Sequence, residues 1–184
     1  MDRFEIKLAG EGGQGLVLAG VILAEAAVKD NKNVAQTQSY GPEARGGASS
    51  SEVVISDGEI DYPKVIQADV LLAMSQEACD KFHSEVKKDG LLIVDSVNVQ
   101  RVPTPEAIQL PITAMAEEVT GKRVTASILA LGLIVGLTGI VSEEAIREAV
   151  RARVPKGTEE VNLKALEAGL AKGRELASAR KRRA

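Results

Sequence analysis

The sequence predicts a three-layer α/β/α fold with a largely parallel, Rossmann-like central sheet and a helical C-terminal third. Short apolar runs at residues 69–74 and 91–95 are typical of strands buried in a parallel sheet. Segments with helix propensity alternate with such runs over the first two thirds of the chain, whereas the pattern from residue 119 onward is almost entirely helical. We therefore expect alternating strands and helices to be followed by helices alone.

Size and composition favour one cytoplasmic domain. With 184 residues, 45% of them hydrophobic, the chain suits a single core, so we expect residues 1–184 to form one domain. A formal net charge of -3 argues against a general nucleic-acid binder, and the basic run at residues 180–183 reads as a solvated helix end. The single cysteine, Cys79, and the single histidine, His83, offer no metal or iron–sulfur cluster. The N-terminus lacks the pattern of a signal peptide.

The first strand and the first helix flank a glycine-rich turn. Residues 3–9 alternate in polarity like a strand, and residues 16–28 are continuously apolar and rich in alanine, as in a buried helix. Glycine lets a ligand approach the main chain, and the free amides at a helix start favour an anion. The turn is therefore a candidate phosphate site, although such glycines can also serve only the packing of strand against helix. Its residues are Gly10, Glu11, Gly12, Gly13, Gln14 and Gly15.

The same turn matches the G-x-G-x-x-G pattern of dinucleotide-binding folds, but a second requirement is missing. NAD sites use an acidic side chain about 20 residues further on, at the end of the second strand, to hold a ribose hydroxyl. The second strand, expected at residues 34–38, ends in Gln36, Thr37 and Gln38 and offers no carboxylate. A phosphorylated ligand other than NAD is the better prediction.

Turn signals divide the middle of the chain. Glycine, proline and aspartate interrupt it at residues 57–58, 62–63 and 89–90. The segments between and beyond these turns predict, in order, a strand at residues 50–55, a strand at 69–74, a helix at 76–88, a strand at 91–95 and a short strand at 107–111.

The C-terminal third contains an apolar segment, residues 124–141, without any charged side chain. Its length is borderline for a membrane span, but hydroxyl side chains and three glycines dilute it. We expect a buried helix that ends near Gly139, with Gly132 and Gly136 allowing another element to approach closely. Two more helices should follow, one capped by Ser142 and one from residue 162 to the end.

A second unusual segment, residues 39–47, follows the second strand and reads Ser-Tyr-Gly-Pro-Glu-Ala-Arg-Gly-Gly. It should lie on the same carboxyl-end rim of the sheet as the glycine turn, where α/β sheets bind ligands. Arg45 has a planar, permanently charged guanidinium that suits phosphate or carboxylate, but it could equally pair with Glu43 at the surface. From the residues alone, both interpretations stay open.

Together, these two motifs make the chain resemble a known family. Gly-Glu-Gly-Gly-Gln-Gly near the N-terminus and Ser-Tyr-Gly-Pro-Glu-Ala-Arg-Gly-Gly after the second strand are similar to the gamma subunit of 2-oxoacid:ferredoxin oxidoreductases. The resemblance covers essentially the whole chain. Within the family, the second motif looks more like the 2-oxoglutarate type (2-oxoglutarate synthase) than the pyruvate type.

The resemblance implies a complex that oxidatively decarboxylates a 2-oxoacid to acyl-CoA and CO2 and reduces ferredoxin. Thiamine diphosphate, magnesium and iron–sulfur clusters would lie on the alpha, beta and ferredoxin-like delta subunits, and this chain would be a non-catalytic subunit without a membrane or nucleic-acid partner. The gamma domain would contribute to the coenzyme A site. That assigns contacts with coenzyme A to Glu11, Gly12, Gly13, Gln14 and Gly15.

The resemblance also suggests roles for residues outside the glycine turn. Where many relatives have an asparagine at the start of the apolar helix, this chain has Ser127, which keeps one hydroxyl for a bond to the coenzyme but lacks the amide fork. Tyr40, Glu43, Arg45 and Gly46 are expected at an inter-subunit rim near the active site. The alternatives for the whole chain are a free-standing Rossmann-like nucleotide-binding regulatory domain and a purely structural adaptor.

Overall fold

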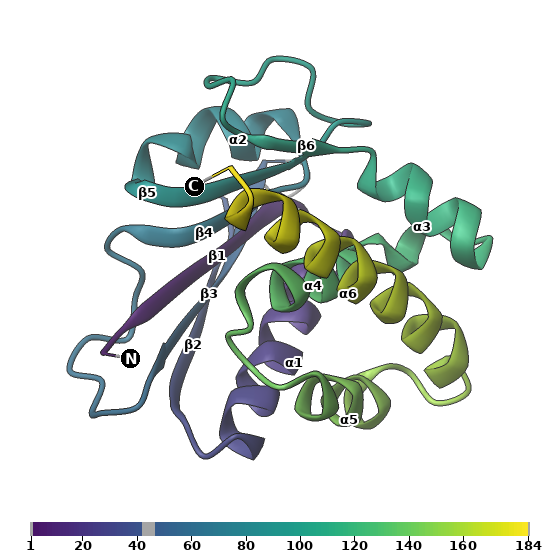
Figure 1. Cartoon of the computed structure of the whole chain (residues 1–184), viewed down its shortest axis with the longest axis horizontal. Coiled ribbons are helices and arrows are strands. Elements are labelled where there is room, and N and C mark those ends of the chain that lie inside the picture. The colour runs from purple at the N-terminus through teal and green to yellow at the C-terminus, as the bar shows by residue number, and fades with distance from the viewer. Residues whose placement is uncertain (1, 42–46, 184) are drawn as a thin grey trace.

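The computed structural model describes residues 2–41 and 47–183, and shows a central sheet between two helical layers (Figure 1). Its strands are β1 (Phe4–Glu11), β2 (Asn33–Ser39), β3 (Ala48–Ser56), β4 (Ala68–Ala73), β5 (Val86–Asp95) and β6 (Ile108–Leu110). Its α-helices are α1 (Leu16–Lys29), α2 (Gln76–Phe82), α3 (Ile112–Thr120), α4 (Ala126–Thr138), α5 (Glu143–Arg153) and α6 (Glu159–Lys181). Two 3-10 turns, η1 (His83–Glu85) and η2 (Arg123–Thr125), complete the described elements.

The strands lie in the order β2-β3-β1-β4-β5-β6. β1, β4, β5 and β6 pair in parallel, whereas β3 is antiparallel to both of its neighbours, so β3 alone runs against the other strands. The predicted α/β/α architecture with a largely parallel sheet is confirmed. Because β2 and β3 are consecutive and antiparallel, no crossover helix is needed between them. The carboxyl ends of β1, β2, β4 and β5 consequently meet at one edge.

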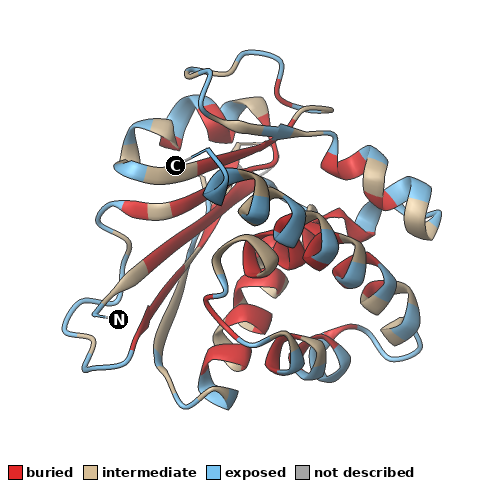
Figure 2. Ribbon diagram, in the orientation of Figure 1, coloured by how far each residue is buried: buried red, intermediate tan, exposed pale blue. Residues whose placement is uncertain are grey.

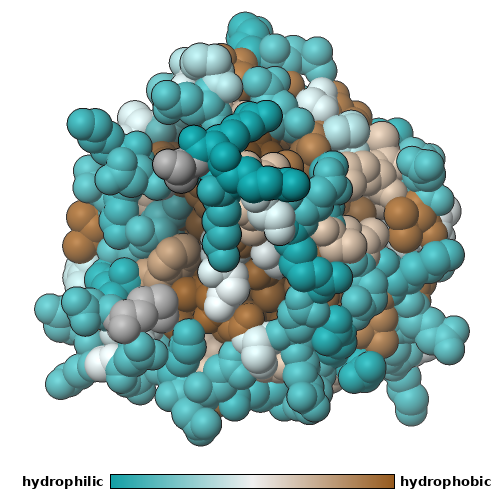
Figure 3. Space-filling model, viewed as in Figure 1, coloured by the Kyte–Doolittle hydropathy of each residue, from teal (hydrophilic) through white to brown (hydrophobic). Residues whose placement is uncertain are grey.

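The two faces of the sheet have separate hydrophobic cores. Ile6 and Leu8 of β1 point to the larger core, which α1, α3, α4, α5 and α6 cover. Ala9 points the other way, toward Cys79 and Phe82 of α2. Figure 2 shows buried residues along the middle of the strands and on the inward sides of the helices. Figure 3 shows mainly hydrophilic side chains on the outside of the helical layer.

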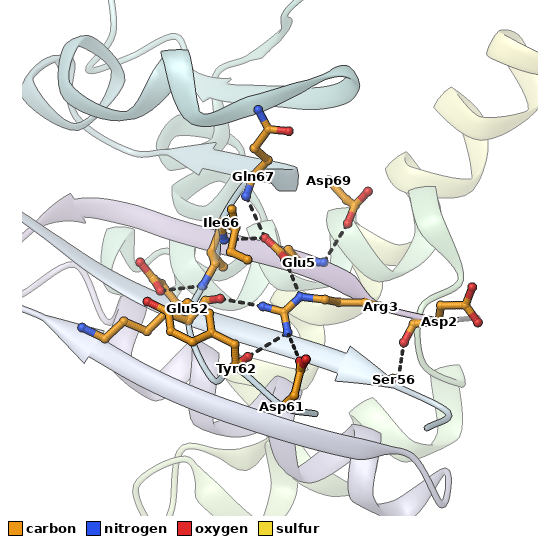
Figure 4. Close-up of polar contacts among 12 residues, drawn as sticks. Asp2, Arg3, Glu5, Glu52, Ser56, Asp61, Tyr62, Ile66, Gln67 and Asp69 are labelled. Carbon is orange, nitrogen blue, oxygen red and sulfur yellow. Dashed lines mark hydrogen bonds and ion pairs between the residues drawn. The ribbon is translucent and has the colours of Figure 1, made fainter. Parts of the chain in front are cut away.

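Charged residues tie the segment after β3 to the sheet on the α2 side (Figure 4). Arg3 donates to the carbonyl oxygens of Tyr62 and Lys64, each at 2.7 Å. The buried carboxylate of Glu5 accepts from the backbone amides of Ile66 and Gln67 at 2.7 and 2.9 Å. These bonds satisfy the buried charge of Glu5 and hold the segment across β1.

Helices α4 and α6 pack with their backbones in contact. A Cβ added at Gly132 or Gly136 would come within 3.0 Å of backbone atoms of α6, and one added at Gly169 or Gly173 within 3.0 Å of backbone atoms of α4. The expected close approach at Gly132 and Gly136 is therefore correct, as is the helix end at Gly139, where φ is 63°. No helix in the described part of the chain is long and apolar enough to cross a membrane.

Most element boundaries agree with the sequence-based expectation to within two residues, but the following differ by more. The helix expected at residues 76–88 ends at Phe82, and β5 begins at Val86 and continues through the expected break at Asp89-Gly90. β5 does so with a register shift against β4, which leaves Gly90 too close to the carbonyl of Ala68 for any side chain. Helix α3 was not expected as a separate element, and α6 begins at Glu159 rather than at residue 162.

Candidate functional site

The turn between β1 and α1, here called the glycine loop (residues 10–15), leaves backbone amides open to a ligand. Gly13 and Gly15 have φ values of 88° and 79°, which favour glycine. Gly15 is the N-cap of α1, no side chain caps this end, and the first turn contains no acidic residue. A Cβ at Gly12 or Gly13 would meet nothing within 4 Å. The loop therefore presents free donors and a positive helix end to an open space.

Gln14 fixes the shape of the glycine loop. Its Oε1 accepts from the amide of Glu11 at 2.7 Å, and its Nε2 donates to the carbonyl of Met74, after β4, at 3.0 Å. Gly10 makes room for this side chain, because a Cβ there would lie within 3.0 Å of both Gln14 Oε1 and Leu16 Cδ1. The packing interpretation thus applies to Gly10, whereas Gly12 and Gly13 keep the space above the loop clear.

Two cavities border the glycine loop and share Gln14, Met74 and Asn98, so they form one crevice along the carboxyl edge of the sheet. The acidic cavity has a volume of about 460 Å³ and is lined by Glu11, Gln14, Met74, Ser75, Gln76, Glu77, Asp80, Asn98 and Arg101. The arginine cavity has a volume of about 280 Å³ and is lined by Gly13, Gln14, Met74, Asn98, Thr113, Arg123, Val124 and Ala126.

The two cavities differ in charge. The acidic cavity contains three carboxylates, of which Asp80 lies 3.4 Å from Arg101. Arg123 is the charged side chain of the arginine cavity, and its partner Glu117 is 3.7 Å away with both side chains more than half exposed. Such an exposed pair is weak, so Arg123 is free to turn toward an anion. An anionic group is thus favoured beside Arg123 and disfavoured beside the three carboxylates.

The buried carboxylate of Asp95, at the end of β5, positions two residues of the crevice. It accepts from the amide of Asn98 at 3.0 Å and from both the backbone amide and the hydroxyl of Thr113. The Thr113 hydroxyl and the Asn98 side chain are therefore held in place by a carboxylate that is itself 0% exposed. The neighbouring Cys79 is no candidate nucleophile, because burial raises the pKa of its thiol, with a smaller effect from Asp80.

Most of the candidate residues lie together around the glycine loop. Glu11 and Gln14 line the acidic cavity, Gly13 and Gln14 line the arginine cavity, and Gly12 is exposed between β1 and α1. Ser127 is 4% exposed and lies beneath the loop, with its Oγ 2.8 Å from the position that a Cβ of Gly15 would occupy. Ser127 thus supports the loop from the first turn of α4.

The second motif reaches the same edge of the sheet at both of its ends. Ser39 lies opposite Ser50, and Ala48 lies opposite Glu11 of the glycine loop. Tyr40 is 65% exposed there. The candidate residues Glu43, Arg45 and Gly46 fall outside the described residues.

The sequence interpretation named Glu11, Gly13 and Gln14 but missed the other residues that line the crevice. These are Met74, Ser75, Gln76, Glu77, Asp80, Asn98, Arg101, Thr113, Arg123, Val124 and Ala126. Met74 and Asn98 follow the carboxyl ends of β4 and β5, a position that could have marked them. Arg123 carried no such signal, because η2 reaches the crevice only through the packing of α3 and α4. Among the described residues, no group of three or more histidine, cysteine or acidic side chains could hold a metal ion.

Comparisons with known proteins agree on one family. Residues 5–172 match the family model described as pyruvate ferredoxin/flavodoxin oxidoreductase. The chain is 50% identical over 179 residues to 2-oxoglutarate synthase subunit KorC of Methanocaldococcus jannaschii, covering 95% of this chain and 96% of that one. It is 48% identical to the gamma subunit of the keto/oxoacid ferredoxin oxidoreductase of Geobacter sulfurreducens, with a TM-score of 0.85 and coverage of 95% and 98%.

A more distant structure adds a ligand-bound relative. The 2-oxoglutarate:ferredoxin oxidoreductase of Magnetococcus marinus, solved with 2-oxoglutarate, coenzyme A and succinyl-CoA, matches with a TM-score of 0.80 and 25% identity. The match covers 97% of this chain but 32% of the relative. In that protein, the fold described above is one part of a longer polypeptide.

Proposed function

The chain belongs to the pyruvate ferredoxin/flavodoxin oxidoreductase family as a gamma subunit most like that of 2-oxoglutarate synthase, and we propose that it supplies part of the coenzyme A site of such a complex. The complex would convert 2-oxoglutarate and coenzyme A to succinyl-CoA and CO2 and pass two electrons to ferredoxin. Residues 1–184 would act as one gamma domain in the cytoplasm. The observation that carries the proposal is the glycine loop, whose free amides border a crevice with separate acidic and basic halves.

The charge of the crevice suggests how coenzyme A is oriented. Its diphosphate is anionic and suits the amides of Gly12 and Gly13, the start of α1 and the guanidinium of Arg123. An uncharged part of the coenzyme suits the acidic cavity, where Glu11 and Asp80 can accept hydrogen bonds from amide or amino groups. The three carboxylates would repel a phosphate placed there, so the reverse orientation is disfavoured.

The chemistry of decarboxylation belongs to other subunits in this proposal. Thiamine diphosphate, magnesium and the iron–sulfur clusters would be held by alpha, beta and ferredoxin-like delta subunits. The residues of this chain would bind the coenzyme and orient its thiol toward the acyl group formed elsewhere. The segment from Tyr40 through Arg45 to Gly47 would face those subunits at the rim of the crevice.

The proposal is tested by substituting the anion-binding half of the crevice in the reconstituted complex. Arg123→Ala should raise the KM for coenzyme A about tenfold, equal to about 1.4 kcal/mol, and leave the KM for 2-oxoglutarate unchanged. Glu117→Gln is the matched control, because it removes the same ion pair but keeps the guanidinium. With a truncated thiol that lacks the diphosphate, Arg123→Ala and the unchanged complex should have equal KM values.

Two results would contradict the proposal. If Arg123→Ala and Gly12→Val both assemble normally and leave the KM for coenzyme A unchanged, the crevice does not bind the coenzyme. Tight binding of NAD or of an adenine nucleotide to the isolated chain, measured by calorimetry, would instead favour a free-standing regulatory domain.

A further inference from the structure

The outer edge of β2 is an open strand edge. β2 pairs with β3 along all seven residues from Asn33 to Ser39, and the sheet ends there, with no described strand on the other side. Proteins usually protect such an edge with charged side chains, proline or a bulge. β2 reads Asn-Val-Ala-Gln-Thr-Gln-Ser, which has no charge and no proline, and its register against β3 is regular throughout. The edge is therefore able to pair with another strand.

An apolar stripe runs along α1. Val17, Val21, Ala24 and Val28 are spaced by four, three and four residues, which places them on one side of a helix. The first three are half-buried, and Val28 is 59% exposed. None of them is among the fully buried residues of α1, although Ala24 packs partly against the core.

The contacts of α1 show which way this stripe faces. Gly20 marks the side toward the sheet, because a Cβ there would lie 3.6 Å from Gln36 Nε2 of β2 and closer still to Ser51 of β3. Lys29 marks the side toward α5, because its Nζ lies 3.4 Å from Glu148. At about 100° per residue, Val17 is about 60° and Val21 about 100° from Gly20, on the side away from the buried residues of α1. Ala24, about 40° from Gly20, is the member of the stripe nearest the sheet and packs partly against the core. The stripe thus borders the open edge of β2. Figure 1 shows α1 and β2 next to each other.

We propose that the open edge of β2 and the apolar stripe of α1, together the edge surface, bind a second copy of this chain about a two-fold axis. β2 would pair antiparallel with its own copy, so that the two sheets continue as one. The two α1 helices would then meet above the joined strands, stripe against stripe. The inference is independent of the coenzyme site, which involves other residues.

Self-complementarity is what favours a second copy over another partner. In a two-fold contact the same surface of both copies meets, so a charged residue near the axis would face the same charge on the other copy and be repelled. The edge surface contains none: β2 is uncharged, and the charged residues beside the stripe, Glu25 and Lys29, pair with Arg153 and Glu148 of α5. An interface of this kind joins main-chain hydrogen bonds with an apolar contact, as in strand addition generally.

The edge surface is modest in size, which sets the expected affinity. A strand of seven residues spans about 24 Å at about 3.4 Å per residue. Stable interfaces bury about 1,600 Å² in total, and a contact made of one strand edge and one helical stripe falls at the lower end of that class. We therefore expect a dimer that dissociates in the micromolar range.

Sedimentation velocity of the full chain tests the proposal. A dimer should form as the concentration rises to about 200 µM, well above a micromolar dissociation constant. Val28→Glu and Val21→Glu should shift the chain to the monomer by placing like charges against each other across the axis. Ala171→Glu, at an exposed position of α6, is the matched control and should leave the dimer intact. Circular dichroism should confirm that all variants keep their helices.

Hydrogen exchange locates the contact. Amides in residues 33–39 should gain protection with increasing concentration, and the gain should disappear in Val28→Glu. A monomer at the highest concentration overturns the proposal, as does a dimer that both glutamate variants leave unchanged. Protection of residues 33–39 that appears only when another subunit of the complex is added would assign the edge surface to that subunit and would equally overturn a second copy.

Discussion

Two groups of glycines in this molecule have opposite surroundings. At the contact between α4 and α6, a Cβ on Gly132 or Gly169 would enter the space of another helix backbone. In the glycine loop, a Cβ on Gly12 or Gly13 would meet no atom within 4 Å. The first group is required by packing that already exists, whereas the second leaves room for a group that the chain does not itself contain. The space around a glycine, rather than the glycine itself, separates a packing role from a binding role.

The largest effect is expected at the helix contact. Gly169→Ala places a methyl group against the backbone of Leu129 and Leu133, and neither backbone can move without separating α4 from α6. We expect a loss of about 3 kcal/mol in the free energy of unfolding, at the upper end for an overpacked core. Urea denaturation of the isolated chain measures it. A loss below about 0.5 kcal/mol, typical of an ordinary surface site, would show that the two helices are not held this closely.

Gly10→Ala should have an intermediate effect on stability. Gly10 lies in the glycine loop but, like the glycines of α4 and α6, is closely packed. The added methyl group would meet Gln14 Oε1, Leu16 Cδ1 and Met74 Cβ. Side-chain ends can move more easily than a backbone, so we expect a loss of about 1 to 2 kcal/mol in stability. Displacement of Gln14 should also raise the KM for coenzyme A in the complex. A change in stability without a change in this KM would separate the loop conformation from coenzyme binding.

The sequence pattern predicted much of this comparison, but not all of it. The alternation of apolar strands and helices was visible because buried parallel strands form short, distinct apolar runs, as in β4 and β5. Gly132 and Gly136 stood out inside an apolar helix, whereas their counterparts Gly169 and Gly173 lie in a polar helix and became meaningful only through tertiary packing. The direction of β3 depends likewise on its neighbours, and a strand pattern has no direction.

The candidate site likewise has one part that the sequence predicted and another that only the folded structure shows. The glycine loop was visible because its chemistry is local, with successive residues forming one turn. Arg123, Asn98 and Thr113 come from three segments that only the folded chain brings together, and Asp95 orders two of them from a buried position. The local motif therefore predicted the position of the candidate site, whereas tertiary structure decides which charges surround it.

An ion pair in the same helical layer should contribute less than either packing glycine. Hydrogen bonding to Arg174 lowers the pKa of Glu143, with a further contribution from Arg147, so this carboxylate stabilises the fold when ionised. Because the folded pKa is below the unfolded one, the stabilisation is present above pH about 4.3 and is lost as the pH falls through the folded pKa. Glu143→Gln should reduce stability at neutral pH by less than about 1 kcal/mol. Thermal unfolding as a function of pH should show a difference at pH 7 that decreases as the pH falls and Glu143 becomes protonated.

The smallest effect on stability is expected at Gly12, which borders open space and so differs most from the packed glycines of α4 and α6. Gly12 has no positive φ, and a Cβ there would meet nothing within 4 Å, so Gly12→Ala and Gly12→Val should fold without strain. Urea denaturation should place Gly12→Ala within about 0.5 kcal/mol of the unchanged chain. Gly58→Val, in another exposed turn, is the control for a β-branched side chain. If Gly12→Val unfolds the chain while Gly58→Val does not, the space above the loop is needed for folding; if it raises only the KM for coenzyme A, that space is reserved for the ligand.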